Sequence, residues 1–293
     1  MRLPPFEYHE PQTLQEACTL TARFGSGGAV IAGGTDLLVN MKNGGVAPTA
    51  LISIGKLKEL REIETDASGV SIGAAVSVRD CIESDKLTPW TALVQSAREL
   101  GTPLTRNLAT VGGNVMSARA SADLLPVLMG YGGVAFVRNV DGERKISLLD
   151  FFVGPGRTVP GPDFILTKIH LPSLNKGVGA AYVRLGTHKH RDINAVNVGA
   201  WLWLDGPGGS IVSGRVVLGA VGPVPRTSSR AAEFLRGKIP GAAVFEEAGQ
   251  AAMGDARPID DHRGSAEDKR RLIGVLTARA LHCAWIDAER ALQ

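Results

Sequence analysis

Two stretches, Ala32-Gly33-Gly34-Thr35-Asp36 and Thr110-Val111-Gly112-Gly113-Asn114, decide the fold of this chain. Each follows residues typical of a β-strand or of the run into one, and each has a small polar side chain directly after its glycines. Paired glycines tolerate positive φ and let successive backbone N–H groups converge on one point. Such a row of donors binds an anion, most often a phosphate. A single Gly-Gly pair is more commonly a tight turn, but two pairs of the same design predict two loops that close on one pyrophosphate.

Length and composition narrow the class of protein. The chain has 293 residues, enough for two domains and a large core. It has 32 basic and 29 acidic residues, a net charge of +3 and 5% aromatic residues, which argues against a nucleic-acid surface. Cys18, Cys81 and Cys283 form no CxxC pair. This spacing argues against a disulfide framework, a zinc site or an iron–sulfur cluster held by this chain alone.

The N-terminal residues, Met1 to Pro5, lack the apolar segment of a signal peptide. No apolar run approaches the length of about eighteen residues that a membrane helix requires. We therefore expect a cytoplasmic protein without a membrane span.

Helix and strand signals in the first fifty residues predict a βαβ-like opening. Thr13-Leu14-Gln15-Glu16 has the capping-box pattern and predicts a helix that ends at Gly25. Residues 28–31 and 50–54 are predicted strands, and residues 36–42 are predicted to be helical. The first glycine stretch then lies at the carboxyl end of its strand, where open α/β sheets bind ligands.

The rest of the chain is predicted from turn, cap and period-two signals. Thr88-Pro89 is expected to supply the N-cap and first residue of a helix that ends at Gly101. The best linker candidate is Pro172 to Gly177. The other predicted elements are strands at 70–73, 134–138, 164–171, 196–204 and 211–221, a helix start at 77–80, a Gly/Pro-rich loop at 154–162, and helices at 228–236, 244–253 and 265–290.

The sequence contains no Walker A, GxGxxG, GxSxG or HExxH motif. His188, His190 and Asp192 would share one strand face and could bind a transition metal. Lys189 and Arg191 add positive charge beside them, so a polar strand end is favoured over a metal site.

Two interpretations of Asp123 stay open at this stage. It precedes the apolar Leu124-Leu125, where a carboxylate favours a helix N-terminus. It also lies close in sequence to the second glycine stretch, where it could accept hydroxyl groups of a ribose or ribityl chain. Arg157, Arg184 and Arg191 are expected to be solvent-exposed.

A family resemblance follows from the order of these motifs. Phe6-x-Tyr8, Pro11 and the capped helix precede the first glycine stretch, and Arg106-Asn107-x-Ala109 precedes the second. With this spacing the chain resembles the FAD-binding medium subunits of the molybdenum hydroxylases. That family includes carbon monoxide dehydrogenase, 4-hydroxybenzoyl-CoA reductase and the flavin domain of xanthine dehydrogenase. Residues 263–267, Arg-Gly-Ser-Ala-Glu, resemble its small C-terminal domain, so the resemblance covers nearly the whole chain.

The resemblance implies an α+β fold in two domains. Residues 1–175 would form a vanillyl-alcohol-oxidase-type FAD-binding domain, with subdomains at about 1–56 and 57–175. Residues 177–293 would form the C-terminal domain of the carbon monoxide dehydrogenase flavoprotein type, a small α+β domain with a three-stranded antiparallel sheet.

The resemblance also implies FAD as the cofactor, with no metal ligand and no catalytic acid or base on this chain. The first glycine stretch and its neighbours, with the second, would hold the pyrophosphate, and Asp123 the ribose or ribityl hydroxyls. Leu166 would lie near the adenine or the ring, and Lys189 and Ile193 against the isoalloxazine. The implied cofactor-binding residues are Ile31, Ala32, Gly33, Gly34, Thr35, Asp36, Leu37, Thr110, Gly112, Gly113, Asn114, Asp123, Leu166, Lys189 and Ile193.

Partners follow from the same resemblance. A large subunit would carry the molybdenum cofactor and a small subunit two [2Fe–2S] clusters, in a dimer of heterotrimers. The alternatives are a stand-alone FAD-dependent oxidoreductase of the same fold and a non-enzymatic assembly module that has lost FAD. The chain departs from some members at Ile193, where they place a tyrosine, and at Ala195, where the xanthine dehydrogenase type often has a lysine. It also lacks the cysteine-rich insertion that holds a [4Fe–4S] cluster in other members.

Overall fold

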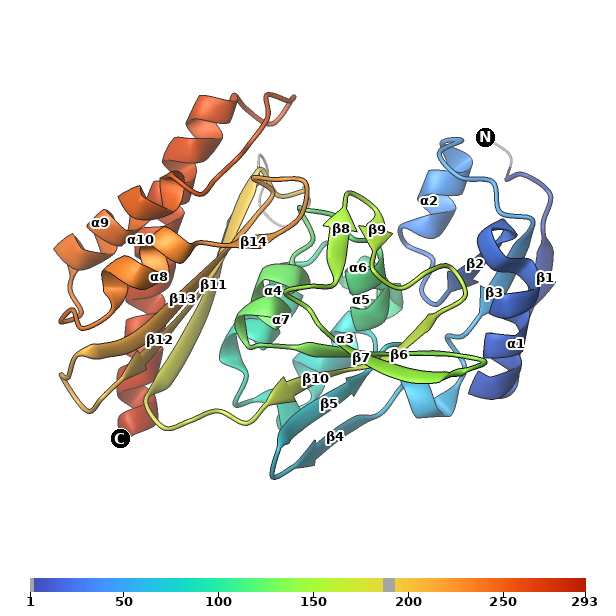
Figure 1. Cartoon of the computed structure of the whole chain (residues 1–293), viewed down its shortest axis with the longest axis horizontal. Coiled ribbons are helices and arrows are strands. Elements are labelled where there is room, and N and C mark those ends of the chain that lie inside the picture. Colours follow the sequence, from blue (N-terminus) through green and yellow to red (C-terminus); the bar gives the residue numbers. More distant parts are fainter. Residues whose placement is uncertain (1–2, 187–192) are drawn as a thin grey trace. The chain divides into compact units, whose positions relative to one another are not determined.

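The computed structural model describes residues 3–186 and 193–293 as an α+β chain that forms two compact units (Figure 1). The first unit contains Met1–Lys86, Thr102–Ala118 and Gly133–Pro172, and the second contains Leu87–Gly101, Arg119–Gly132 and Ser173–Gln293. Two short segments, Leu87–Gly101 and Arg119–Gly132, thus belong to the second unit, although the chain around them belongs to the first. Within the described residues, no helix is both long enough and apolar enough to cross a membrane.

The first unit opens with a small parallel sheet in the order β1-β3-β2. The predicted βαβ opening is present, because β2 and β3 are parallel and α2 connects them. Helix α1 begins after Thr13, whose Oγ1 accepts the Glu16 N–H at 3.1 Å. The capping box is not completed, because the Glu16 carboxylate accepts instead from the N–H of Gln12, at 2.8 Å. The elements are β1 (Glu7–His9), α1 (Leu14–Phe24), η1 (Gly25–Gly27), β2 (Gly28–Ile31), α2 (Leu37–Lys42) and β3 (Ala50–Ser53).

The second sheet of this unit is antiparallel, in the order β4-β5-β10-β6-β7. A bulge interrupts β10 between Leu166 and Lys168, and there the Thr167 carbonyl accepts the Ala74 N–H at 2.8 Å. Ile165 of this sheet packs in one core cluster with Ile52 of the parallel sheet. The elements are η2 (Lys58–Leu60), β4 (Ile63–Asp66), β5 (Gly69–Gly73), α3 (Val78–Glu83), η3 (Asp85–Leu87), α5 (Pro103–Leu108), α6 (Val111–Met116), β6 (Val134–Asn139), β7 (Gly142–Ser147), β8 (Phe152–Gly154), β9 (Arg157–Thr158) and β10 (Ile165–Pro172).

The second unit is built on an antiparallel sheet in the order β11-β12-β13-β14. It has four strands where the resemblance implied three, because the two-residue β14 pairs with Val217 and Leu218 of β13. The elements are α4 (Thr91–Glu99), α7 (Leu124–Gly130), β11 (Val178–Leu185), β12 (Val196–Leu204), β13 (Ile211–Gly219), β14 (Arg226–Thr227), α8 (Ser229–Leu235), α9 (Ala242–Met253) and α10 (Ala266–Leu292).

Helices cover both faces of this sheet, so β12 is buried along almost its whole length. Val198, Ala200 and Leu202 pack with α8, α9 and α10, which lie together on one side of the sheet in Figure 1. Gly199 and Trp201 of the same strand point the other way, toward α7. The alternating direction of the side chains along β12 lets the sheet pack between two layers of helices.

Helix α4 begins later than predicted. Its first residue is Thr91 and its N-cap residue is Trp90, whereas Thr88-Pro89 lies in the preceding turn. The Trp90 N–H bonds to the Leu87 carbonyl at 2.9 Å, and the Trp90 side chain is buried. Burial of this indole fixes the turn, and tertiary packing therefore overrides the local helix-start signal.

Candidate functional site

The first glycine stretch leaves β2 at its carboxyl end, as predicted. Gly34 has φ +69°, a conformation that favours glycine. The backbone of Gly33 packs so closely that a Cβ there would lie 1.8 Å from the Leu108 carbonyl oxygen. The N–H groups of Gly33, Gly34 and Thr35 donate no hydrogen bond within the described part of the chain. This row of three donors, which we call the N–H cradle, suits an anionic ligand.

The second glycine stretch differs from its prediction, because it forms the first turn of α6 instead of a loop after a strand. The N–H groups of residues 111–114 all donate hydrogen bonds within the protein, unlike those of the cradle. The hydrogen bonds run from Val111 N–H to Val76 O at 3.0 Å, from Gly112 N–H to Ala74 O at 2.9 Å, from Gly113 N–H to Thr110 Oγ1 at 3.0 Å and from Asn114 N–H to Thr110 O at 3.0 Å.

The glycines of this turn serve close packing. A Cβ on Gly112 would lie 2.6 Å from the Cβ and the carbonyl oxygen of Ala74, and one on Gly113 would lie 2.9 Å from Thr110 Oγ1. Because Gly33 abuts Leu108, only two residues before Thr110, the two glycine stretches lie side by side in the first unit.

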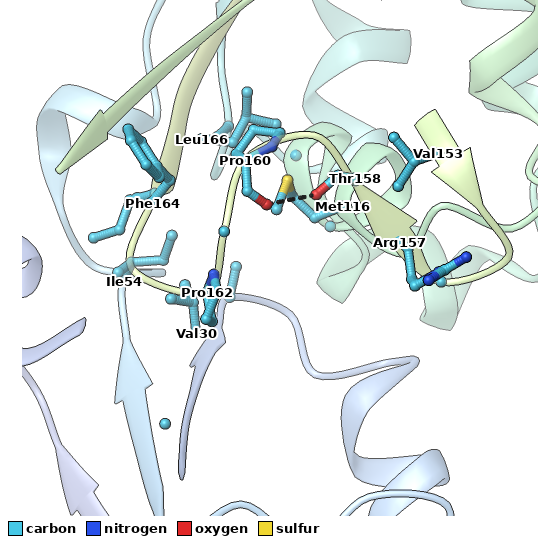
Figure 2. Close-up of a pocket in the computed structure, with 18 residues that line it drawn as sticks. Val30, Ile54, Met116, Val153, Arg157, Thr158, Pro160, Pro162, Phe164 and Leu166 are labelled. Carbon is cyan, nitrogen blue, oxygen red and sulfur yellow. Dashed lines mark hydrogen bonds between the residues drawn. The ribbon is translucent and has the colours of Figure 1, made fainter. Parts of the chain in front are cut away.

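A pocket of about 520 Å³ opens between these stretches and β10 (Figure 2). Of the residues proposed from the sequence, Ala32, Gly112, Gly113 and Leu166 line it. The other proposed residues of the two stretches flank these positions in the chain without lining the pocket: Ile31, Gly33, Gly34, Thr35, Asp36, Leu37, Thr110 and Asn114.

Sequence reasoning missed much of the pocket wall. In Figure 2, Val30, Ile54 and Phe164 gather at one side, whereas Val153 and Arg157 lie at the other. Arg157 carries the only charge among the described lining residues. The remaining lining residues are Gly28, Ala74, Met116, Gly156, Thr158, Pro160, Gly161, Pro162 and Ile165. The Gly/Pro-rich composition of residues 154–162 was the one available signal, since loops near ligands use these residues.

Asp123 lies in the second unit, at the N-terminus of α7. Its Oδ1 accepts hydrogen bonds from Tyr182 Oη at 2.8 Å and from Asn194 Nδ2 at 2.9 Å, and Arg184 Nε lies 3.7 Å away. Burial raises the pKa of Asp123, and the bonds from Asn194, the charge of Arg184 and the bond from Tyr182 oppose that shift. Arg184 was expected at the surface, but its side chain is 8% exposed because Asp123, Asn194 and the Glu99 carbonyl hold it.

The remaining proposed positions are less informative. Ile193 is 49% exposed and belongs to the second unit. Lys189 lies outside the described residues, as do His188, His190, Arg191 and Asp192 of the weighed metal hypothesis.

Two family models match the chain in succession. The model described as FAD binding domain in molybdopterin dehydrogenase matches residues 4–174. The model described as CO dehydrogenase flavoprotein C-terminal domain matches residues 181–284.

Curated relatives match over nearly the full length. The carbon monoxide dehydrogenase medium chain of Hydrogenophaga pseudoflava is 29% identical over 96% of this chain and 98% of its own length. The xanthine dehydrogenase FAD-binding subunit of Escherichia coli O157:H7 is 28% identical over 98% of each chain.

Solved structures are also similar to this chain over nearly its full length. A chain of carbon monoxide dehydrogenase from Hydrogenophaga pseudoflava superposes with a TM-score of 0.94 at 28% identity, over 98% of this chain and 99% of that one. A chain of quinoline 2-oxidoreductase from Pseudomonas putida 86 gives a TM-score of 0.92 at 26% identity, over 99% of this chain and 100% of that one.

Proposed function

We infer that this chain, which belongs to the family of FAD-binding medium subunits of the molybdenum hydroxylases, passes electrons between the [2Fe–2S] clusters of a partner subunit and an external acceptor or donor. The chain is an oxidoreductase subunit with an FAD-binding domain, and its relatives are subunits of multi-subunit enzymes. The electron path and the partners are our proposal.

One observation supports FAD as the cofactor in this proposal: the N–H cradle lies beside an apolar pocket that presents no carboxylate among its described lining residues. A pyrophosphate needs donors without a competing negative charge, and the cradle offers three. Val30, Ile54 and Phe164 supply an apolar wall for a flat aromatic group. The residues present therefore fit a dinucleotide such as FAD.

The two glycine stretches take different parts in this proposal. Gly33, Gly34 and Thr35 would donate to the pyrophosphate, whereas Gly112 and Gly113 would let the chain pack closely and keep the pocket open. Asp123 would bind a ribose or ribityl hydroxyl, and Leu166 would contact the adenine or the ring. We keep Lys189 and Ile193 as proposed neighbours of the isoalloxazine.

FAD, when bound, can exchange electrons singly or as a pair, and the chain supplies its position and its electrostatic surroundings. We propose a large molybdenum-cofactor subunit and a small [2Fe–2S] subunit as partners, in a cytoplasmic dimer of heterotrimers. Relatives named medium chains, and a solved relative titled a Cu,Mo-CO dehydrogenase, support this assembly.

The domain description is also a proposal. The family matches at 4–174 and 181–284 support domains at 1–175 and 177–293. The separate parallel and antiparallel sheets of the first unit support two subdomains of the vanillyl-alcohol-oxidase type, at about 1–56 and 57–175.

The test is a visible spectrum of the purified chain, with the released cofactor identified by chromatography. A flavin spectrum with FAD released is expected. A colourless protein that takes up no added FAD would overturn the proposal. Affinity purification from the native cell, with molybdenum and iron measured in the eluate, tests the partners; a flavoprotein that turns over a substrate without either metal would favour a stand-alone oxidoreductase.

A further inference from the structure

The two oxygens of the Asp123 carboxylate have different surroundings. Oδ1 accepts hydrogen bonds from Tyr182 and Asn194 and lies 3.7 Å from Arg184 Nε. Oδ2 accepts no hydrogen bond from any described residue. The side chain is still 15% exposed, so the protein does not enclose it completely. An ionised carboxylate has about four acceptor positions, and here the protein occupies those of one oxygen alone.

The direction of each hydrogen bond follows from its neighbours. Tyr182 Oη accepts from Asn197 Nδ2 at 3.0 Å, so its own proton points to Asp123. Asn194 Oδ1 accepts from Arg184 Nε, which turns its amide nitrogen toward Asp123. Tyr182 Oη and Asn194 Nδ2 therefore both donate to Oδ1, whereas Oδ2 accepts no hydrogen bond from the described residues.

The backbone that leads into Asp123 is held by the same unit. Three successive carbonyls accept hydrogen bonds from β12, from Asn194, which lies two residues before β12, and from Ala220, which directly follows β13. The pairs are Ala120 O with Ala220 N at 2.6 Å, Ser121 O with Asn194 Nδ2 at 3.0 Å and Ala122 O with Asn197 Nδ2 at 3.3 Å.

Asn197 fits only because residue 219 is a glycine. A Cβ there would lie 1.8 Å from Asn197 Oδ1, which is itself buried without a hydrogen-bond partner in the described chain. An unsatisfied buried oxygen is costly, so its retention indicates that the amide nitrogen of Asn197 does something the protein needs.

We propose that Tyr182, Asn194 and Asn197, which we call the carboxylate clamp, are positioning residues that hold Asp123 so that Oδ2 accepts a hydroxyl of the FAD ribityl or ribose. The inference rests on the proposed function, because it takes FAD as the ligand. The clamp and Asp123 all belong to the second unit.

The clamp makes FAD binding depend on pH in a specific way. Oδ2 is a strong acceptor only while Asp123 is ionised, so FAD affinity falls as the pH drops through the pKa of Asp123. Burial and Glu99 raise this pKa, whereas Asn194, Arg184 and Tyr182 lower it. Removing a clamp donor therefore raises the pKa and moves the acid limb of the binding curve toward neutral pH.

The experiment uses the full chain freed of flavin and titrated with FAD, with flavin fluorescence as the readout, from mildly acidic to neutral pH. Asp123→Asn keeps an acceptor at Oδ1 and loses the one at Oδ2, so we expect a Kd about 10-fold higher or more and no acid limb. Tyr182→Phe should move the limb toward neutral pH. Asn194→Asp, a second variant of the same shape, should move it further, because a second carboxylate then faces Asp123.

Tyr131→Phe is the matched control, since Tyr131 is a buried tyrosine of the same unit whose hydroxyl accepts the Ala92 N–H at 3.2 Å. It should lower stability without moving the limb. Competition with ADP, which has a ribose but no ribityl chain, shows which FAD hydroxyl Asp123 binds. Asp123→Asn weakens the binding of ADP only if Asp123 binds the ribose.

Three results decide the matter. The clamp is supported if Tyr182→Phe and Asn194→Asp each shift the acid limb of the FAD-binding curve, and if neither does so when combined with Asp123→Asn. Wild-type FAD binding with an unshifted limb in both variants overturns the clamp and leaves the proposed function standing. A wild-type chain that takes up no FAD at any pH overturns both.

Discussion

Replacing Gly33 with alanine tests whether backbone packing against Leu108 holds the N–H cradle in place. The separation between the new Cβ and the Leu108 carbonyl oxygen must grow from 1.8 Å to at least 3.0 Å, a displacement of about 1.2 Å. Because N–H···O hydrogen bonds have heavy-atom distances near 2.9 Å, a shift of this size breaks any bond from the cradle to a phosphate. Losing one such charge-assisted bond costs about 1.5–3 kcal/mol, which raises the Kd for FAD about 10- to 150-fold.

The same displacement strains the apoprotein, and we expect its free energy of unfolding to fall by about 1–3 kcal/mol. Gly44→Ala is the control for this loss of stability. Gly44 belongs to the same unit and has φ +74°, but a Cβ there would meet no atom within 4 Å. Alanine at residue 44 should cost about 1–2 kcal/mol of backbone strain and leave the Kd for FAD unchanged.

Urea unfolding of the apoprotein and fluorescence titration with FAD measure the two quantities separately. The reasoning would be refuted by a folded Gly33→Ala protein that binds FAD with the wild-type Kd. It would equally be refuted if Gly44→Ala weakened FAD binding as much as Gly33→Ala, because affinity would then simply follow stability.

Three further predictions concern the second unit. Burial raises the pKa of Asp123 above its value in the unfolded chain. The stability that this carboxyl group contributes is therefore present at low pH and is lost as the pH rises through the raised pKa. In urea unfolding at neutral pH, the apo Asp123→Asn variant should be no less stable than the wild type. The pKa of Asp261 is lowered to about 2, first by its hydrogen bond with Lys269, so its contribution is present above the unfolded value of 3.8 and is lost between there and about 2. Asp261→Asn should therefore cost about 1 kcal/mol at neutral pH and flatten the acid limb of an unfolding-versus-pH curve. A Cβ on Gly130 would lie 1.8 Å from the Trp201 ring, so Gly130→Ala should lower the urea-unfolding free energy by about 1–3 kcal/mol.

The sequence predicted those parts of the fold that depend on short-range signals. Ser265 accepts the Asp268 N–H at 3.0 Å and starts α10 after the predicted residue, and the turn at 205–209 separates β12 from β13. These features need only a cap or a turn residue close in the chain. The second glycine stretch was predicted to be an anion-binding loop because paired glycines let successive backbone N–H groups converge on one point. Tertiary hydrogen bonds from its N–H groups to Val76 and Ala74 stabilise the helical turn instead.

The candidate site was only partly predictable, because its contacts join residues that lie far apart in the sequence. Asp123 was identified, but Tyr182 and Asn194 lie 59 and 71 residues further along the chain, and no local pattern pairs them with it. Arg184 is a long charged side chain of a type that is usually exposed, and only the fold reveals that it is buried against the same carboxylate. The pocket wall at Val30, Ile54 and Phe164 consists of ordinary apolar residues, which a sequence cannot distinguish from core.

The position of α7 leads to a last prediction, on truncation at residue 176. Every residue from Leu124 to Gly130 is buried, and the helix packs on β12 and β13, which a chain of residues 1–176 would lack. Each large apolar side chain of α7 that becomes exposed costs about 1.5–3 kcal/mol, so a few of them equal the whole stability of a typical domain, about 5–15 kcal/mol.

We therefore expect residues 1–176 alone to aggregate or to unfold without cooperativity, although they contain the entire match to the FAD-binding family model. Co-expression with residues 177–293 should restore a soluble complex, and far-UV circular dichroism with FAD titration measures the difference. A soluble 1–176 fragment that unfolds cooperatively and binds FAD with the wild-type Kd would contradict this prediction. It would also show that Asp123 needs neither Tyr182 nor Asn194, because both lie beyond the truncation.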